Sequence, residues 1–242
     1  MNRIPAKYLL LFIVLFGQAC SSWKLESIRP TFYKIDSLAI DSSIETIILP
    51  YKHHTDSVMG AELVVLPIDL VKDKPNGNLG IWMADACRAN AARKSNRHAD
   101  IALLNQGGIR RPYLKKGTVT LGMMYELMPF DNLMVVLKVK GSLLKDILAV
   151  AEKRGGEPLS GAVVHVKTGE ARVSINGADL DLDKEYTLVT NDYMYNGGDG
   201  YGVLQNGSKP EYLGLIRDAL IEEVGRNTEF PGSGTLRWIW ND

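Results

Sequence analysis

A short apolar run at 101–104 that ends directly in a glycine-rich turn is the feature that most constrains the fold of this chain. A helical pattern over 78–93 precedes the run, and two adjacent glycines, Gly107 and Gly108, follow it. A helix that leads into a buried strand is typical of α/β proteins, which place ligand-binding groups in the turn after such a strand. The sequence therefore predicts a sheet covered by helices, with a ligand site where this strand ends.

The remaining pattern predicts a single α/β domain in which a mixed β-sheet is flanked by helices. The closely spaced strands between 162 and 190 form hairpins, so they cannot all be parallel. Apolar residues at helical spacing indicate further helices near 41–51, 121–127, 142–153 and 211–224. Besides 101–104, strands are predicted over 58–70, 133–139, 162–166, 171–175, 179–182, 186–190 and 236–240.

The first forty residues resemble a targeting segment and a tether. Two basic residues precede an apolar run over 8–16, and small residues follow it before Cys20. This resembles a bacterial lipoprotein signal, in which the cysteine becomes the lipidated first residue of the mature chain. Gly17 stands where such a signal usually carries Leu, so an ordinary cleaved signal is the alternative. We expect a signal peptide at 1–19, a tether at 20–40, a domain at 41–242, and lipid anchoring through Cys20 in the bacterial cell envelope, at the outer membrane or facing the periplasm.

Composition excludes several classes of protein. With 45% hydrophobic and 23% charged residues, the chain has the composition of a folded globular protein. Its formal net charge is zero, and no run of Lys and Arg alternates with aromatic residues, which argues against a nucleic-acid partner. Besides Cys20 the only cysteine is Cys87, which lies in an apolar helical stretch and is expected to be a small core residue.

Arg110 ends the first of three polar motifs, the segment from Asn105 to Arg110. Adjacent glycines let the backbone approach a ligand closely and turn its amide groups toward an anion. The planar guanidinium of Arg110 suits a phosphate or a carboxylate. From the residue types alone, a tight turn whose arginine faces solvent remains an equal alternative.

The other two motifs offer aromatic rings and a carboxylate. Phe130 lies in the turn-like segment 128–132, and Tyr193 lies in the polar segment 191–201. Two such rings could hold a nucleobase by stacking on both of its faces. Asp199 lies between glycines and could accept hydrogen bonds from paired sugar hydroxyls. Taken singly, each residue has a simpler interpretation, as a core ring or a turn-forming aspartate.

Together the three motifs resemble those of the C-terminal substrate-recognition domain of 5′-nucleotidases and UDP-sugar hydrolases. They follow the order N-x-G-G-I-R, P-F-x-N and N-D-aromatic-x-x-x-G-G-D-G-aromatic, and the resemblance covers about residues 44–240. That family usually has further arginines and a glutamate near positions where this chain has Lys72 and Lys74, which could act only as point charges. The resemblance implies substrate contacts from Asn105 and Arg110 to the phosphate, Phe130 and Tyr193 to the base faces, Asn132 to the base edge, Gly161 by its backbone near the base, and Asp199 to the ribose hydroxyls.

The catalytic part of that family has no counterpart in the motifs of this sequence. Those enzymes hydrolyse phosphoesters with two metal ions held by a separate N-terminal domain rich in Asp, His and Asn. Here no Asp-x-His, Gly-Asn-His or His-Glu-x-x-His motif occurs, and no nucleophile elbow or Walker loop occurs either. The four histidines, His53, His54, His98 and His165, are scattered. The sequence therefore predicts no catalytic residue, no metal site and no other cofactor within this chain.

Three functions fit this pattern. The first is the nucleotide-recognition part of a split 5′-nucleotidase in nucleotide catabolism, with divalent metals held by a separately encoded metallophosphatase chain. The second is a non-enzymatic periplasmic lipoprotein that binds nucleosides or nucleotides. The third is a structural domain whose pocket no longer binds. An exposed apolar surface on the Arg110 side of the pocket would favour the first, because an obligate partner would cover it.

Overall fold

The computed structural model describes residues 41–167, 170–226 and 229–241. The chain divides into two units, Met1–Thr46 and Ile47–Asp242. Of the first unit only the beginning of helix α2 is described. The expected signal peptide, the tether and the lipidation site at Cys20 lie outside the described residues. Within the described residues, every helix is too short or too polar to cross a bilayer.

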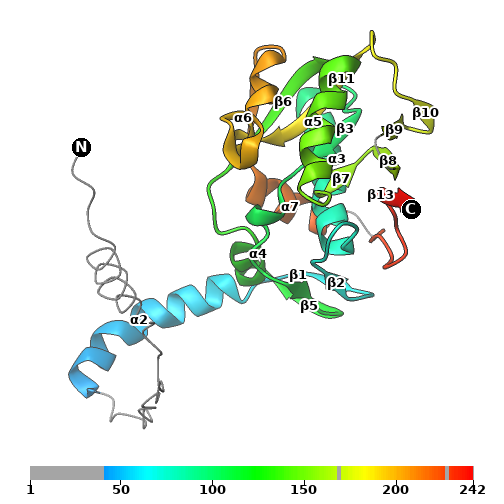
Figure 1. Cartoon of the computed structure of the whole chain (residues 1–242). Helices are drawn as coiled ribbons and strands as arrows, with labels where there is room; N and C mark the ends of the chain where they lie inside the picture. Colours follow the sequence, from blue (N-terminus) through cyan, green and yellow to red (C-terminus); the bar gives the residue numbers. More distant parts are fainter. Residues whose placement is uncertain (1–40, 168–169, 227–228, 242) are drawn as a thin grey trace, which may run out of the picture. The chain divides into compact units, whose positions relative to one another are not determined.

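Figure 1 shows the order of the elements. The helices, short 3₁₀ turns (η) included, are α2 (Ser42–Met59), α3 (Asn78–Ser95), η1 (Gln106–Gly108), α4 (Leu121–Leu127), α5 (Gly141–Lys153), α6 (Asp192–Tyr195), η2 (Gly198–Gly200), η3 (Gly202–Asn206) and α7 (Ile216–Val224). The strands are β1 (Glu62–Leu66), β2 (Leu70–Val71), β3 (Ile101–Leu103), β4 (Tyr113–Leu114), β5 (Gly117–Thr120), β6 (Leu133–Lys140), β7 (Leu159–Ser160), β8 (Ala162–Lys167), β9 (Glu170–Ile175), β10 (Ala178–Asp179), β11 (Glu185–Asn191), β12 (Glu211–Leu215) and β13 (Trp238–Asn241).

A five-stranded mixed sheet forms the centre of the second unit, with the strand order β12-β6-β11-β3-β7. In it β11 runs parallel to β3 and antiparallel to β6. A second sheet has the order β10-β9-β8-β13, and the pairs β1-β5 and β2-β4 form two small ribbons. The predicted fold class, α/β with mixed strand directions, is confirmed.

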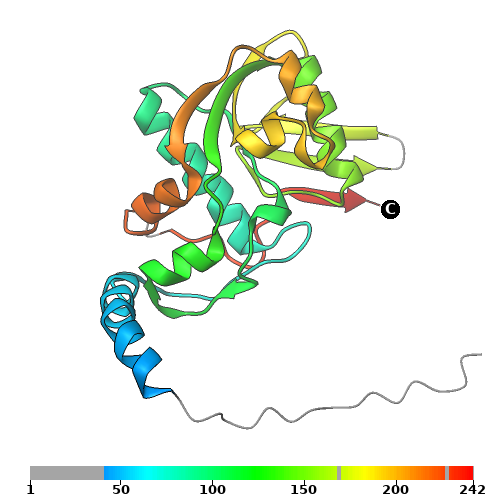
Figure 2. The same cartoon turned by 90° about the vertical axis from the view of Figure 1, so that its left-hand side faces the viewer.

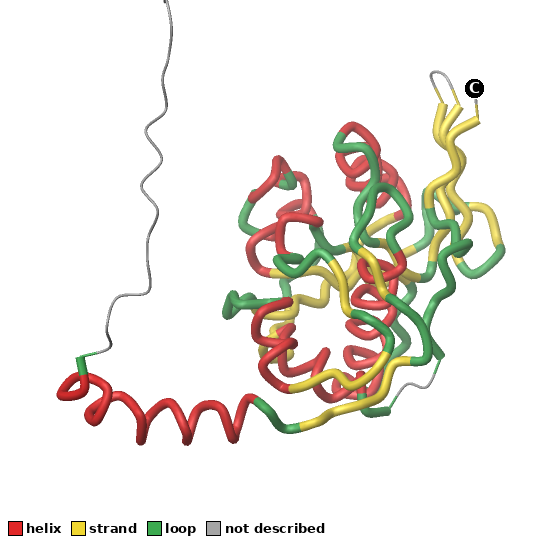
Figure 3. The backbone as a smooth tube through the Cα atoms, turned by 90° about the horizontal axis from the view of Figure 1, so that it is seen from below, coloured by secondary structure: helices red, strands yellow, loops and turns green. Residues whose placement is uncertain are grey.

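Both faces of the central sheet are buried. Ile101 and Leu103 of β3 belong to one apolar core, whereas Ala102 belongs to the other, because successive side chains of a strand point to opposite faces. Helices α3 and α7 cover the face of the sheet on which Ala102 lies. Helix α5 and the strands β8 and β9 cover the face on which Ile101 and Leu103 lie. Figure 3 shows the strands between helices on either side.

The predicted helix over 211–224 is wrong in its first part. Residues Glu211–Leu215 form β12, which pairs antiparallel with β6, and Figure 2 shows these strands side by side in orange and green. Gly214 adopts a left-handed conformation with φ of 93°, which a right-handed helix cannot contain. Only Ile216–Val224 is helical.

The predicted strand over 58–70 starts too early, because α2 continues to Met59 and the extended segments are β1 and β2. Helix α2 has Pro50 in its interior and no buried residue, although its isoleucines recur at helical spacing. The strand expected at 179–182 ends at Asp179. The other predicted elements are confirmed to within a few residues, namely the helices at 78–93, 121–127 and 142–153 and the strands at 101–104, 133–139, 162–166, 171–175, 186–190 and 236–240.

Candidate functional site

The candidate site lies where the central strands end. Because β3 and β11 are parallel, their carboxyl ends lie at the same edge of the sheet. The antiparallel strand β6 begins at that edge, where Met134 pairs with Asn191. The turns after β3 and β11 and the turn before β6 therefore meet, and these three turns carry the three sequence motifs.

A pocket of about 320 Å³ opens between these turns. It brings together six of the seven residues that the family resemblance implies, and two adjacent glycines complete its lining. The lining residues are Asn105, Gly107, Gly108, Arg110, Phe130, Asn132, Tyr193 and Asp199.

The two rings of the pocket are presented to solvent. Phe130 is 41% exposed and Tyr193 is 45% exposed, so neither ring belongs to the apolar core. Gly198 packs directly against Tyr193, because a Cβ at that glycine would lie 2.5 Å from two atoms of the ring. The absence of a side chain at Gly198 thus lets the Tyr193 ring occupy this position.

A buried arginine holds the turn that carries Phe130. Arg217 of α7 donates hydrogen bonds to the backbone oxygens of Met128 and Phe130, at 3.2 and 3.4 Å. It also forms an ion pair of 2.8 Å with Asp131. Arg217 lies outside the three sequence motifs. The spacing of the apolar residues around it indicates only an amphipathic helix. A fixed turn keeps the ring in place when no ligand supports it.

Asp199 occupies a constrained position at the other side of the pocket. Its backbone is left-handed, with φ of 57°, which is uncommon for any residue other than glycine. One carboxylate oxygen, Oδ1, lies 3.0 Å from Nη2 of Arg154. The other, Oδ2, accepts a hydrogen bond of 2.9 Å from the side-chain amide of Asn105. The carboxylate is therefore oriented before any ligand binds.

Asn105 contacts Asp199 and Asn191, and it is 5% exposed. Its amide oxygen accepts a hydrogen bond of 2.9 Å from the Asn191 side chain. Asn191 in turn caps α6 by accepting a hydrogen bond from the backbone of Met194. In this arrangement Asn105 supports the carboxylate of Asp199, whereas the family resemblance implies a role at the phosphate end.

Arg110 and Lys72 provide positive charge at one side of the site. The guanidinium of Arg110 lies 5.6 Å from the centre of the Phe130 ring. The Lys72 ammonium donates a hydrogen bond of 2.7 Å to the backbone oxygen of Ile109. Burial, followed by the charges of Arg110 and Lys74, lowers the pKa of Lys72. Of the two lysines considered from the sequence, Lys72 is thus held beside Arg110, whereas Lys74 donates to the backbone oxygen of Arg154.

Gly161 is not among the residues that line the pocket. It follows β7, whose Ser160 pairs with Ala102 in β3 and whose Leu159 pairs with Leu103. Because this pairing is antiparallel, Gly161 lies toward the beginning of β3, whereas Asn105 follows its end. A Cβ at Gly161 would collide with the backbone of Asp100, so this glycine permits a close approach of two backbones.

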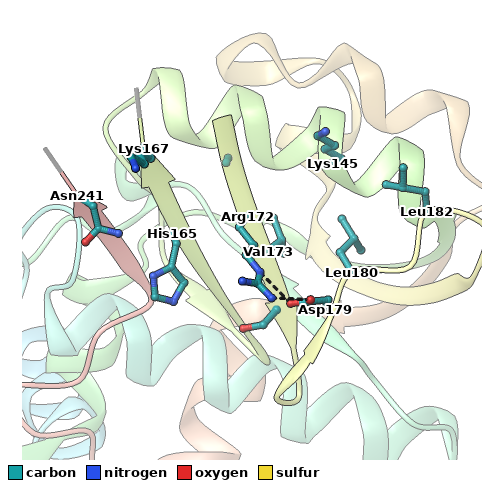
Figure 4. Close-up of a pocket in the computed structure, with 11 residues that line it drawn as sticks. Lys145, His165, Lys167, Arg172, Val173, Asp179, Leu180, Leu182 and Asn241 are labelled. Carbon is teal, nitrogen blue, oxygen red and sulfur yellow. Dashed lines mark hydrogen bonds and ion pairs between the residues drawn. The ribbon is translucent and has the colours of Figure 1, made fainter. Parts of the chain in front are cut away.

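A larger hollow, of about 800 Å³, lies on the sheet of β8 and β9. Figure 4 shows basic side chains there, among them Lys167, His165 and Arg172. Arg172 is already paired with Asp179 through hydrogen bonds of 3.1 and 2.7 Å. The described lining of this hollow contains no Phe, Tyr or Trp side chain, so the imidazole of His165 is the one ring there and a base could not stack between two rings.

Within the described part of the chain, no group of three or more His, Cys, Asp or Glu side chains could hold a metal ion. Cys87 is fully buried, and burial, together with the charge of Glu223, raises the pKa of its thiol to about 12. A thiol with so high a pKa stays protonated and does not act as a nucleophile. The interpretation of Cys87 as a core residue agrees with this environment.

Comparisons with known proteins identify relatives of this chain. Trifunctional nucleotide phosphoesterase protein YfkN of Bacillus subtilis is 33% identical over 156 residues, which cover 57% of this chain and 10% of that protein. Snake venom 5′-nucleotidase of Crotalus adamanteus is 29% identical over 172 residues, which cover 60% of this chain and 29% of that protein. This chain therefore spans well under half the length of either relative.

Solved structures share the fold. The 5′-nucleotidase precursor from Thermus thermophilus superposes with a TM-score of 0.67 at 24% identity, covering 83% of this chain and 43% of that one. The NAD nucleotidase of Haemophilus influenzae superposes with a TM-score of 0.62 at 20% identity, covering 84% and 42%. A sequence model described as "5′-nucleotidase, C-terminal domain" matches residues 68–206, more than half of the chain. The chain therefore belongs to the 5′-nucleotidase C-terminal domain family.

Proposed function

We propose that this chain is the nucleotide-recognition part of a split 5′-nucleotidase, completed by a separately encoded metallophosphatase chain. The observation that carries the proposal is the pocket in which the charge of Arg110, the rings of Phe130 and Tyr193 and the carboxylate of Asp199 converge. A nucleoside monophosphate has a matching group for each of them. At about 320 Å³ the pocket also falls within the usual range for small ligands, roughly 300–1,000 Å³.

The base is assigned to the two exposed rings. Stacking needs a ring face that is not packed against the core, and both Phe130 and Tyr193 meet that condition. Asn132 lines the same pocket, and its amide offers both a donor and an acceptor to a base edge. These groups support binding of a nucleobase.

The phosphate is assigned to the side of Arg110. Its guanidinium can form two parallel hydrogen bonds to phosphate oxygens. Burial, and after it the charge of Arg110, lowers the pKa of Lys72, so the two cations disfavour one another at this side of the site. A bound phosphate would offset that repulsion, although Lys72 offers a point charge where an arginine would offer a fork.

Catalysis is assigned to the partner chain. Two divalent metals held there would activate a water molecule and neutralise charge on the phosphoryl group. The residues of this chain would bind the nucleotide, stack its base and orient its phosphate toward that partner. Phosphate monoesters hydrolyse extremely slowly without such help, so a recognition domain by itself should bind without turnover.

An exposed apolar pair supports a partner on the Arg110 side. Val71 and Tyr113 are cross-strand neighbours in the β2-β4 ribbon, and they are 46% and 42% exposed. In the sequence they lie next to Lys72 and close to Arg110. A partner docked at this side of the site would cover these two side chains.

The proposal also includes the cellular location of this chain. The sequence before residue 21 resembles a lipoprotein signal, so the mature chain would be anchored through Cys20 in the bacterial cell envelope. The metallophosphatase chain would have to reach the same compartment to complete the enzyme.

Phosphate release from AMP tests the proposal. The chain from residue 21 onward is mixed with a candidate metallophosphatase chain of the same organism, in Mg²⁺, Mn²⁺, Zn²⁺ or Co²⁺. We expect release only when both chains are present, and a lower rate with Arg110→Gln. Arg172→Gln, at an arginine outside the pocket, should leave the rate unchanged. If the metallophosphatase chain alone is as fast as the mixture while this chain binds AMP, the split enzyme is wrong and the binding lipoprotein is favoured.

A further inference from the structure

We propose that Arg154 is a positioning residue that fixes the Asp199 carboxylate for recognition of two neighbouring sugar hydroxyls. The inference rests on the proposed function, because it assumes that Asp199 faces the sugar of a bound nucleoside. No sequence motif includes Arg154, which directly follows α5.

A single guanidinium holds both the side chain and the backbone of Asp199. Nη2 of Arg154 lies 3.0 Å from Oδ1 of Asp199. Nη1 donates a hydrogen bond of 3.3 Å to the backbone oxygen of the same residue. The arginine thereby limits rotation of the carboxylate and movement of the left-handed turn that carries it.

Glu157 anchors that guanidinium from the interior. It is fully buried, and its Oε1 accepts a hydrogen bond of 2.8 Å from Nε of Arg154. Its Oε2 accepts one of 2.6 Å from the backbone of Gln106, and its backbone oxygen accepts one of 2.8 Å from the Trp238 ring. Glu157 is thus held at three points. The hydrogen bond to Glu157 raises the pKa of Arg154, so the guanidinium keeps its charge.

The lone pairs that remain on Asp199 define what the residue can recognise. An ionised carboxylate accepts about four hydrogen bonds, two at each oxygen. Arg154 occupies Oδ1 and Asn105 occupies Oδ2, so each oxygen keeps a free acceptor position. Two acceptors on one rigid carboxylate match two hydroxyls on neighbouring carbons. A carboxylate that could rotate would lose this match, because ordering it would cost free energy on binding.

The selectivity between two nucleosides tests the proposal. The chain from residue 21 onward is titrated with adenosine and with 2′,3′-dideoxyadenosine, which lacks both hydroxyls. Both ligands are uncharged, so removal of a positive charge has little direct effect on their affinity. We expect the wild type to prefer adenosine by about tenfold or more, since hydrogen bonds to a charged group are among the stronger ones. Arg154→Gln should weaken adenosine toward the affinity of dideoxyadenosine and leave the latter unchanged.

Three further variants separate positioning from folding. Arg154→Gln alone leaves Glu157 buried without its ion pair and could destabilise the fold. The double variant Arg154→Gln with Glu157→Gln removes both charges, and the glutamine amide introduced by the second change can still accept from Gln106, so this variant should fold and lose the preference for adenosine. Arg154→Lys keeps the positive charge and should therefore restore part of that preference. The restoration should be incomplete, because a lysine cannot hold two carboxylates with one planar group. Arg172→Gln, which breaks an exposed ion pair with Asp179, should change neither affinity.

The outcomes distinguish this inference from the proposed function. If the wild type prefers adenosine and the folded double variant prefers it equally, positioning by Arg154 is wrong while nucleoside recognition stands. If both affinities fall together in the variants, the arginine has only a structural role and the inference is also wrong. If the wild type binds neither nucleoside, the proposed function fails and this inference fails with it.

Discussion

The side-chain amide of Asn105 donates a hydrogen bond of 2.9 Å to the Asp199 carboxylate and so joins two turns that lie 94 residues apart in the chain. The same amide group accepts a hydrogen bond from Asn191 at the end of β11. The ends of two parallel strands and the glycine-rich turn therefore share one polar network. Members of such a network are coupled, because removal of one leaves its partners unsatisfied.

Asn105→Ala should lower the affinity for adenosine and destabilise the fold. The amide of Asn191 would lose its acceptor in a buried environment, which costs on the order of 1–3 kcal/mol. Urea unfolding measures that loss, and titration with adenosine and AMP measures binding. A variant that loses affinity for AMP and keeps that for adenosine would place Asn105 at the phosphate, as the family resemblance implies.

Six of the residues that line the pocket could be predicted from the sequence, because each of them lies in one of the three local motifs. Glycine-rich turns beside short apolar strands are recognisable without knowledge of the strand order. The sheet then explains why they meet, since β3 and β11 end at one edge and β6 begins there.

The residues that support the pocket could not be predicted in this way. Arg154 follows a helix, and Arg217 lies within an amphipathic one, so each reads locally as an ordinary surface arginine. Their roles depend on partners distant in sequence, such as Asp199 and Asp131. The error at β12 has a similar origin, because pairing with β6 and the left-handed Gly214 overrode an apolar spacing that favours a helix.

Gly198→Ala should disturb the pocket through Tyr193. The added Cβ would lie 2.5 Å from the ring and 2.6 Å from the backbone oxygen of Tyr193, so the ring must move. We expect a loss of adenosine affinity comparable to that of Tyr193→Ala. Gly202→Ala is the matched control, because a Cβ there meets no atom within 4 Å. Equal adenosine affinities of Gly198→Ala and Gly202→Ala would show that the position of the ring does not matter for binding.

Cys87 should resist thiol reagents until the protein unfolds. Its folded pKa of about 12 exceeds the value near 8.5 expected in the unfolded chain. The stability that the protonated thiol contributes is therefore complete below about pH 8.5 and is lost as the pH rises toward 12. Between these limits, the unfolding free energy of the wild type should fall relative to that of Cys87→Ala by about 1.4 kcal/mol per pH unit. Rapid labelling of the native protein at pH 8 would contradict burial of this thiol.

Cys20→Ser should release the protein from the membrane. Lipidation requires the cysteine thiol, and the preceding segment resembles a lipoprotein signal. Fractionation of cells with and without detergent measures the change. If the wild type is already soluble without detergent, the lipid anchor is wrong and an ordinary cleaved signal is favoured.

Stacking of one base between the Phe130 and Tyr193 rings predicts that the losses caused by removing the two rings are coupled. If Phe130 and Tyr193 stack on the two faces of one base, each alanine variant should lose about 1–3 kcal/mol of adenosine binding, or roughly tenfold to more than a hundredfold in Kd. The two losses should not add, because the second ring clamps little once the first is gone. Tyr193→Phe keeps the ring face and should bind almost normally.

Titration of the four variants with adenosine decides this prediction. An uncharged ligand is used because Phe130 also contacts Arg110, at 5.6 Å from ring centre to guanidinium, and its loss could disturb phosphate binding. The double variant gives the coupling between the rings. Additive losses would mean that the rings act independently. A defect of Tyr193→Phe as large as that of Tyr193→Ala would mean that the hydroxyl, and not the ring face, contacts the ligand.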